Sequence, residues 1–236
     1  MRVLMDIAIE LKTDVEKNLA AVLDRIQNSM MRTQKSKTLT SLVVVSKTQS
    51  IEKIEIALKA GHRIFGENRI QEATSKWPDL KIKYSGTELH LIGPLQTNKV
   101  KEAVSLFDVI ETVDRPKLAI EIKKEIVKQG VNIRCYVQVN TGEEEQKAGI
   151  LPAEAENFVN YCQDTIGLTI DGLMCIPPVH EEPALHFTLL KAMGERLGIS
   201  TFSMGMSNDF ETAIQFGATH VRIGSSIFGK RDSVLA

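Results

Sequence analysis

The chain has 236 residues, of which 43% are hydrophobic and 25% are charged. This composition is ordinary for a globular protein, and it excludes a mainly disordered chain, a collagen-like chain and a disulfide-held miniprotein. Lysine and arginine number 29 and aspartate and glutamate number 30, so the net charge of −1 argues against broad, non-specific nucleic-acid binding.

No segment is long and apolar enough to be expected to cross a bilayer. The longest aliphatic run, residues 42–45, is far shorter than the ~18 residues that such a span needs. Asp6 and Glu10 interrupt any apolar run near the N-terminus, so we expect neither a signal peptide nor a membrane anchor.

The cysteines are Cys135, Cys162 and Cys175. They are odd in number and form no C-x-x-C pair, which is typical of reduced thiols in a cytoplasmic protein. No pair of histidines or cysteines has the spacing of metal ligands, so we expect no structural zinc.

The first half of the chain is predicted to form one long helix followed by alternating strands and helices. Apolar residues recur at three- and four-residue spacing from Leu11 to Met30, which predicts an amphipathic helix. Ser50 suits the N-cap of the next helix, and Gly61 suits its end. Helices are predicted over 11–30, 51–60, 69–76 and 98–105, and strands over 42–46, 62–65, 89–92 and 107–111.

The second half continues the alternation. Pro152 suits the first turn of a helix, and Ser207 suits the N-cap of a short helix that ends at Gly217. Helices are predicted over 114–129, 152–162, 185–197 and 207–216, with a last one beginning at Ser225, and strands over 134–139, 168–174, 201–204 and 220–223.

Eight strands with a helix in nearly every gap predict a parallel sheet. Eight such units in a chain of this length fit a single (β/α)8 TIM barrel with an extra N-terminal helix, forming one domain over residues 1–236. An open doubly wound sheet is the main alternative. No G-x-G-x-x-G follows the first strand, so a dinucleotide-binding fold has little support.

In such a barrel the chemistry lies where strands end, and the first strand is followed by Lys47. Lys47 shares the alternation of Val43 and Val45, which directs its side chain toward the barrel interior. An amine at an apolar barrel mouth loses hydration, which lowers its pKa, and a neutral amine attacks an aldehyde to form a Schiff base. The alternative is a lysine that is simply solvated at a strand end.

The last two strands end in Ser203-Met204-Gly205-Met206-Ser207 and Arg222-Ile223-Gly224-Ser225-Ser226. Turns rich in glycine and serine that lead into helices present amides, hydroxyls and a helix dipole to an anion. The loops after strands seven and eight are also the recurrent phosphate position of these barrels. The pattern therefore predicts a phosphate site, with ordinary helix caps as the alternative.

Other polar residues interrupt or end the strands. Arg222 lies in an apolar strand, where a guanidinium needs a partner, either a carboxylate or a bound ligand. His90 is the kind of lone strand histidine that is more often a satisfied core residue, and Glu144 and Lys147 are spaced for a surface ion pair. The residues without an assigned role, which form either a second ligand surface or packing, are Glu67, His90, Gln96, Asn98 and Lys99.

Taken together, these segments resemble the YggS/PROSC family, also called pyridoxal phosphate homeostasis proteins, which is similar to the N-terminal barrel of bacterial alanine racemase. The resemblance covers residues 42–231. It rests on LVVVSKT, GHRIFGENRIQEA, HLIGPLQTNK, QVNTGEEEQKAG, DGLMCIP and SMGMSNDFETAIQFGATHVRIGSSIFGKR. It implies an alanine-racemase-like barrel that binds pyridoxal 5′-phosphate.

The resemblance also implies a role for particular residues. Lys47 would hold pyridoxal phosphate as a Schiff base, and Arg222 would approach its pyridine nitrogen. The phosphate would be cradled by Ser207, Gly224 and Ser225, with Ser226 nearby. The rest of the cofactor site would be Asn68, Met174, Ser203 and Met206.

Two classes of function remain, a carrier and an enzyme. An arginine at the pyridine nitrogen disfavours its protonation and so weakens the electron sink that pyridoxal phosphate enzymes use. This alone does not exclude catalysis, because the resemblance implies the same arginine in racemases of the related fold. Alanine racemases also append a β-domain that supplies a second base, and we expect no counterpart, because the chain ends soon after its eighth strand unit.

The resemblance therefore implies a cytoplasmic homeostasis protein, not an enzyme, that holds pyridoxal phosphate and supplies it to apo-enzymes that depend on this cofactor. It also implies a monomer. The alternatives are a small pyridoxal-phosphate-dependent amino-acid racemase or lyase, and a barrel for another phosphorylated metabolite in which Lys47 is a simple charge.

Overall fold

The computed structural model describes residues 2–33 and 39–229, and these form a closed barrel of parallel strands. The strands are β1 Ser41–Val45, β2 Ile64–Glu67, β3 Glu88–Leu91, β4 Val109–Val113, β5 Arg134–Val139, β6 Gly172–Cys175, β7 Phe202–Ser203 and β8 His220–Ile223. Each strand pairs with the next, and β8 pairs back to β1 with Val43 opposite Arg222. This last pairing closes the sheet, so the predicted TIM barrel is confirmed and the open doubly wound sheet is excluded.

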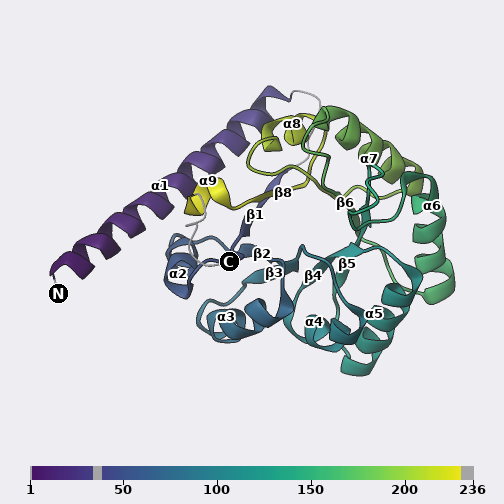
Figure 1. The fold of residues 1–236 in the computed structure, drawn as a ribbon, viewed down its shortest axis with the longest axis horizontal. Helices are drawn as coiled ribbons and strands as arrows, with labels where there is room; N and C mark the ends of the chain where they lie inside the picture. The colour runs from purple at the N-terminus through teal and green to yellow at the C-terminus, as the bar shows by residue number, and fades with distance from the viewer. Residues whose placement is uncertain (1, 34–38, 230–236) are drawn as a thin grey trace.

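Helices surround the barrel (Figure 1). They are α1 Arg2–Arg32, α2 Ile51–Lys59, α3 Ile70–Lys83, α4 Val100–Leu106, α5 Pro116–Gln129, α6 Pro152–Asn160, α7 Pro183–Leu197, α8 Phe210–Gln215 and α9 Ser225–Phe228. A 3-10 turn, Thr97–Lys99, precedes α4, and a π-helical segment, Tyr161–Ile166, continues α6. The predicted extra N-terminal helix is α1, which lies along the outside of the barrel beside α8 and α9.

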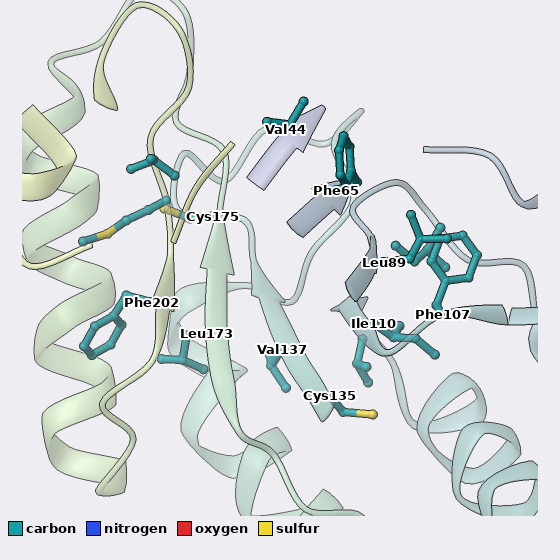
Figure 2. Close-up of a cluster of buried hydrophobic side chains, with 14 of the residues drawn as sticks. Val44, Phe65, Leu89, Phe107, Ile110, Cys135, Val137, Leu173, Cys175 and Phe202 are labelled. Atoms are coloured by element: carbon teal, nitrogen blue, oxygen red, sulfur yellow. The ribbon is translucent and has the colours of Figure 1, made fainter. Parts of the chain in front are cut away.

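The hydrophobic core lies mainly between the strands and the helices. Outward-facing strand residues such as Val44, Phe65, Leu89 and Ile110 are fully buried there (Figure 2). Because strand side chains alternate, the intervening residues face the lumen of the barrel. Bulky aliphatic side chains usually fill that lumen, but this one is rich in polar groups: Glu88, His90, Glu111, Tyr136, His220 and Arg222.

Some strands begin later than predicted because the residues before them make other hydrogen bonds. The backbone N–H of His62 donates to the carbonyl of Ala57, which completes the end of α2, so β2 begins two residues later than expected. The N–H of Leu168 donates to the carbonyl of Cys162 at 2.8 Å, which ties this segment to the π-helical turn. As a result β6 forms only at Gly172–Cys175.

Two helices are clearly longer than predicted, since α1 begins at Arg2 instead of Leu11 and α3 also extends. The sequence places a helix end near Lys76, but α3 continues to Lys83 and includes Pro78. Proline lacks an N–H and so leaves the carbonyl of Thr74 without its helical partner. Both residues are exposed, so water can bond to that carbonyl and the helix continues.

Candidate functional site

A cavity of about 490 Å3 opens where the strands end, the edge at which a TIM barrel carries its chemistry. Its walls come from segments that follow β1, β2, β3, β6, β7 and β8. Seven of the predicted site residues line it: Lys47, Asn68, Met206, Ser207, Arg222, Gly224 and Ser225. The closed barrel therefore brings together residues from both ends of the chain.

Lys47 enters the cavity wall from the end of β1. The strand before it is apolar and buried, and Ser46 continues the pairing with β2 through its N–H, which donates to the carbonyl of Gly66 at 3.0 Å. Lys47 itself is half-buried. Among the lining residues that the structure describes, Lys47 supplies the one primary amine, and Arg222 is the other cationic side chain.

Two serine hydroxyls meet at the wall of the cavity. Ser225 Oγ donates to Ser207 Oγ at 3.0 Å, which joins the turn after β7 to the turn after β8. Gly224 stands beside them with no side chain, and a Cβ there would lie 2.9 Å from the carbonyl oxygen of Val45. The close approach of these two backbones requires a glycine. The result is a small pocket of hydroxyls and backbone groups that suits an anion.

The predicted N-cap at Ser207 is wrong. The N-cap of α8 is Asp209, and its carboxylate accepts from the N–H of Met206 at 2.6 Å, which sets a turn before the helix. Ser207 lies inside that turn with its hydroxyl directed to Ser225. Because α8 starts later and α9 has four residues, the helix dipoles contribute less to this pocket than the sequence pattern suggested.

Arg222 lies at the floor of the cavity and is 4% exposed. Its guanidinium donates to Ser203 Oγ at 2.6 Å and to the carbonyl of Cys175 at 2.8 Å. Glu111 lies 3.8 Å away and is fully buried. Arg222 thus has the carboxylate partner that one of its two alternatives predicts, and it also lines the cavity.

A column of paired charges runs down the lumen from Arg222. Ser203 Oγ donates to Glu111 at 2.6 Å, and the other oxygen of Glu111 is 2.6 Å from His90 Nδ1. His90 Nε2 is 2.6 Å from Glu88, which pairs with Arg134 at 2.5 Å. His90 is therefore a satisfied core residue, as its position predicts.

The pairing sets the charges in this column. Burial alone would lower the pKa of His90, but hydrogen bonds to Glu111 and Glu88 outweigh it and hold that pKa above its ordinary value. Burial alone would raise the pKa of Glu111, but the hydrogen bond to His90 and the charge of Arg222 hold it below its ordinary value. The column is thus an imidazolium between two carboxylates, with a guanidinium at each end.

Known proteins that are similar to this chain in sequence and in fold show the family to which it belongs. Residues 18–232 match the family model of the alanine racemase N-terminal domain. The chain is 36% identical over 228 residues to the pyridoxal phosphate homeostasis protein of Pasteurella multocida, covering 92% of this chain and 98% of that one. It is 35% identical to the protein of the same name from Escherichia coli K12, covering 93% and 97%. The chain belongs to the pyridoxal phosphate homeostasis protein family. The resemblance noted from its motifs is confirmed.

Solved structures that resemble this chain support the same family assignment. PipY of Synechococcus elongatus, solved without pyridoxal phosphate, is 30% identical with a TM-score of 0.81, covering 91% of this chain and 100% of that one. The same protein has been solved with pyridoxal phosphate bound. Alanine racemase of Clostridium difficile has a TM-score of 0.69 at 13% identity and is covered over 58% of its length, a likeness that shows the shared barrel fold.

Three of the predicted site residues do not line the cavity of this pyridoxal phosphate homeostasis family member. Ser203 and Met174 are fully buried at the ends of β7 and β6, where they are paired across the two strands. Ser203 touches Arg222, so it reaches the cavity only through that guanidinium. Ser226 lies in α9, next to Ser225.

Sequence reasoning did not identify one wall of the cavity. This wall is the loop between β6 and α7, and its lining residues are Ile176, Pro177, Pro178, Val179, Glu181 and Pro183. Its nearest signal was the proline pair that begins two residues after a strand, at the edge where ligands bind. Glu111 was also missed, although an acid inside an apolar strand gives the same signal as Arg222 does.

The residues without an assigned role fall into two groups. Glu67 and His90 are fully buried in hydrogen-bonded networks, whereas Gln96 and Asn98 are exposed and Lys99 pairs with Glu102. Lys147 pairs with Glu144, as predicted.

In the part of the chain that the structure describes, the cysteines and the metal-ligating side chains form no further candidate site. The three cysteines are buried and free. Over residues 2–33 and 39–229, no cluster of three potential metal ligands occurs and no helix could span a membrane.

Proposed function

We propose that this chain binds pyridoxal 5′-phosphate in the cavity, with the amine of Lys47 as the group that attaches to it. The observation that carries the proposal is the meeting of one lysine amine, one serine pair and one guanidinium around a single cavity of about 490 Å3. An aldehyde, a phosphate and a ring nitrogen are the three features of this cofactor that such groups recognise. The names of the relatives and the PipY structure with pyridoxal phosphate support the assignment.

The residues present fit this group. Asn68 lines the cavity, and its side-chain oxygen is buried without a hydrogen-bond partner in the described structure. A buried acceptor of this kind is costly unless a ligand or a water donates to it. A donor on the bound cofactor would satisfy Asn68, and an anion between Ser207 and Ser225 would accept from their hydroxyls and nearby backbone N–H groups.

Bound pyridoxal phosphate supplies an aldehyde that condenses with an amine, releasing water, and a ring that accepts electrons when its nitrogen is protonated. With its ring nitrogen beside Arg222, the bound cofactor would be less readily protonated there. A guanidinium has five N–H groups, so beyond its bonds to Ser203 and Cys175 it can donate to the ring nitrogen. A permanently charged donor at this position would favour the unprotonated ring and so weaken the electron sink that carbanion chemistry uses.

We propose in addition that the chain holds and supplies pyridoxal phosphate rather than turning over a substrate. The support is Arg222 at the floor of the cavity and the shared name of the relatives. In this proposal the protein is a single-domain monomer in the cytoplasm, and its recipients are apo-enzymes that use the same cofactor. A racemase or lyase would instead exchange the α-hydrogen of an added amino acid with solvent deuterium at a rate that depends on Lys47.

Spectroscopy with a matched pair of variants tests the assignment. The wild-type protein incubated with pyridoxal phosphate should develop a visible absorption band that borohydride removes, and peptide mass mapping should then place the pyridoxyl label on Lys47. Lys47→Ala should abolish the band. Lys101→Ala, which removes an exposed lysine of α4, should leave it unchanged. No band in the wild type, or a label on another lysine, would overturn the assignment and favour another phosphorylated ligand.

A further inference from the structure

The turn that follows β1 holds a strained residue next to the cavity lysine. Thr48 has a φ of 63°, in the left-handed region that β-branched residues rarely adopt. Such a conformation persists only where the surrounding structure holds it in place. On the other side of Lys47, Ser46 is fully buried. The lysine therefore lies between one buried and one strained neighbour.

Side chains from β2 and α3 hold both of these neighbours. Lys76 Nζ donates to the backbone carbonyl of Ser46 at 3.2 Å, and Ser46 Oγ donates to Glu67 at 2.8 Å. The backbone N–H of Thr48 donates to Glu72 at 2.5 Å. The chain is thus fixed immediately before and immediately after Lys47 by side chains of neighbouring elements.

Lys76 joins the two carboxylates to each other. Its Nζ lies 2.5 Å from Glu72 and 3.4 Å from Glu67, and its side chain is 10% exposed. Glu67 is fully buried, and Trp77 Nε1 donates to the same oxygen at 3.1 Å. The second oxygen of Glu67 has no hydrogen-bond partner in the described structure, and burial raises the pKa of this carboxyl. One ammonium group compensates both acids, so its loss would release the contacts on each side of Lys47.

We infer that Lys76 and Glu72 are positioning residues that hold Lys47 at the cavity wall in the orientation in which its amine meets the aldehyde of pyridoxal phosphate. The inference rests on the proposed function, because it concerns the attachment to Lys47. Neither residue lines the cavity. They act through the backbone of residues 46–48 and touch no ligand.

Four variants separate this role from general stability. Lys76→Met removes the ammonium and keeps an unbranched apolar stem. Glu72→Ala removes the acceptor of the Thr48 N–H, whereas Glu72→Gln keeps an oxygen acceptor and loses only the charge. Lys81→Met is the matched control, because Lys81 lies on the same helix and pairs with Asp108 at 2.7 Å, away from the Lys47 turn.

Three readouts are compared in the full-length variants. They are the rate at which the visible band appears on adding pyridoxal phosphate, the fraction of borohydride-fixed label on the Lys47 peptide, and the affinity for inorganic phosphate. Lys76→Met and Glu72→Ala should slow the band at least about 10-fold and move label to other lysines, because a displaced nucleophile reacts slowly. Glu72→Gln should lie between Glu72→Ala and the wild type. Lys81→Met should match the wild type, and phosphate affinity should stay unchanged in all four.

The outcomes are distinguishable. If the wild type forms no band, the proposed function fails and this inference with it. If the wild type forms the band and the folded Lys76→Met and Glu72→Ala proteins form it equally fast, the positioning role is wrong. It is also wrong if phosphate affinity falls in parallel with the rate, because that result indicates a general loss of structure. Should Lys76→Met fail to fold, wild-type rates in both Glu72 variants would overturn the inference.

Discussion

Arg222 shows how one residue gains a fixed position from partners that are far away in the sequence. Its guanidinium donates to Ser203 Oγ, which in turn donates to Glu111, at 2.6 Å in each case. The hydroxyl bridges two buried charges whose nearest atoms are 3.8 Å apart. The resemblance implied that Ser203 contacts the cofactor. In the structure Ser203 instead orients the Arg222 guanidinium, which lines the cavity.

Ser203→Ala should destabilise the protein by about 1–3 kcal/mol, because it leaves a buried guanidinium and a buried carboxylate each with one partner fewer. Urea unfolding monitored by circular dichroism measures the change. Ser105→Ala is the control, because Ser105 is exposed on α4 and its hydroxyl bonds only a helix carbonyl, so its cost should stay within about 0.5 kcal/mol. Equal costs for the two variants would show that the Ser203 bridge adds no stability.

At this scale the sequence identified individual groups but not their pairing. Lys47 and Arg222 could be predicted because a charge beside or within an apolar strand is conspicuous. The contact between Glu111 and His90 could not, because it depends on the register of β3 against β4, which single-strand patterns do not contain. The contacts of α3 with residues 46–48 could not be predicted for the same reason, because they join two elements that local periodicity treats separately.

Among the elements, α1 has a role that its amphipathic pattern only partly suggested. Its buried stripe consists of Val15, Leu19, Val22 and Ile26, whereas Leu11 lies outside the described side chains. Figure 1 shows α1 beside α8 and α9, the helices that follow the two serine turns. Asn18 Nδ2 donates to the carbonyl of Ile227 at 3.1 Å, and Arg25 pairs with Glu211 at 3.1 Å. The helix therefore supports from outside the two helices at the Ser207 and Ser225 turns.

Leu19→Ala should lower the free energy of unfolding by about 2–5 kcal/mol, because it opens a hole in a fully packed layer. Leu23→Ala is the matched control: it truncates the same residue type on the same helix, but Leu23 is 43% exposed and should cost less than about 1 kcal/mol. Urea unfolding compares the two. An equal loss of unfolding free energy in the two variants would mean that α1 is not packed as described.

Element types were predictable and element ends were not. The spacing of apolar residues distinguishes helices from strands, because the two repeat at different periods. The end of an element depends on which hydrogen bonds compete for it, as at Leu168, whose N–H is taken by Cys162, and at Asp209, which replaces Ser207 as the cap. Apolar spacing does not reveal either competitor, because the Cys162 carbonyl is a backbone group and Asp209 is as suitable an N-cap residue as Ser207.

For the whole molecule, the count of alternating elements favoured the closed barrel, and the pairing of β8 with β1 decides it against the open doubly wound sheet. The count could not predict a lumen in which charged residues replace aliphatic layers. All eight described strands belong to one closed sheet, which supports a single domain, although that remains a prediction for the full 1–236 chain. A charged lumen has a consequence for the entire fold, because its ionisation states are coupled to folding.

The lumen should make the protein sensitive to acid in two pH windows. A hydrogen bond to His90 and the nearby charge of Arg134 lower the pKa of Glu88 from 4.5 to about 2. Burial lowers the pKa of His220 from 6.5 to about 4. In both cases the unfolded chain binds the proton more readily than the folded one, so acid favours unfolding. His220 should cost stability as pH falls from 6.5 toward 4, and Glu88 as it falls from 4.5 toward 2.

Each proton contributes a slope of up to about 1.4 kcal/mol per pH unit. Glu67 opposes this trend, because burial raises its pKa and the folded state then binds the proton more readily. Urea unfolding at a series of pH values from neutrality downward measures the sum. Glu88→Gln should flatten the curve below pH 4.5, since the amide still accepts from His90 but no longer titrates. Glu102→Gln, at an exposed glutamate on α4, should leave the curve unchanged. A Glu88→Gln protein with the full wild-type slope in this window would show that Glu88 does not set the acid limit of the fold.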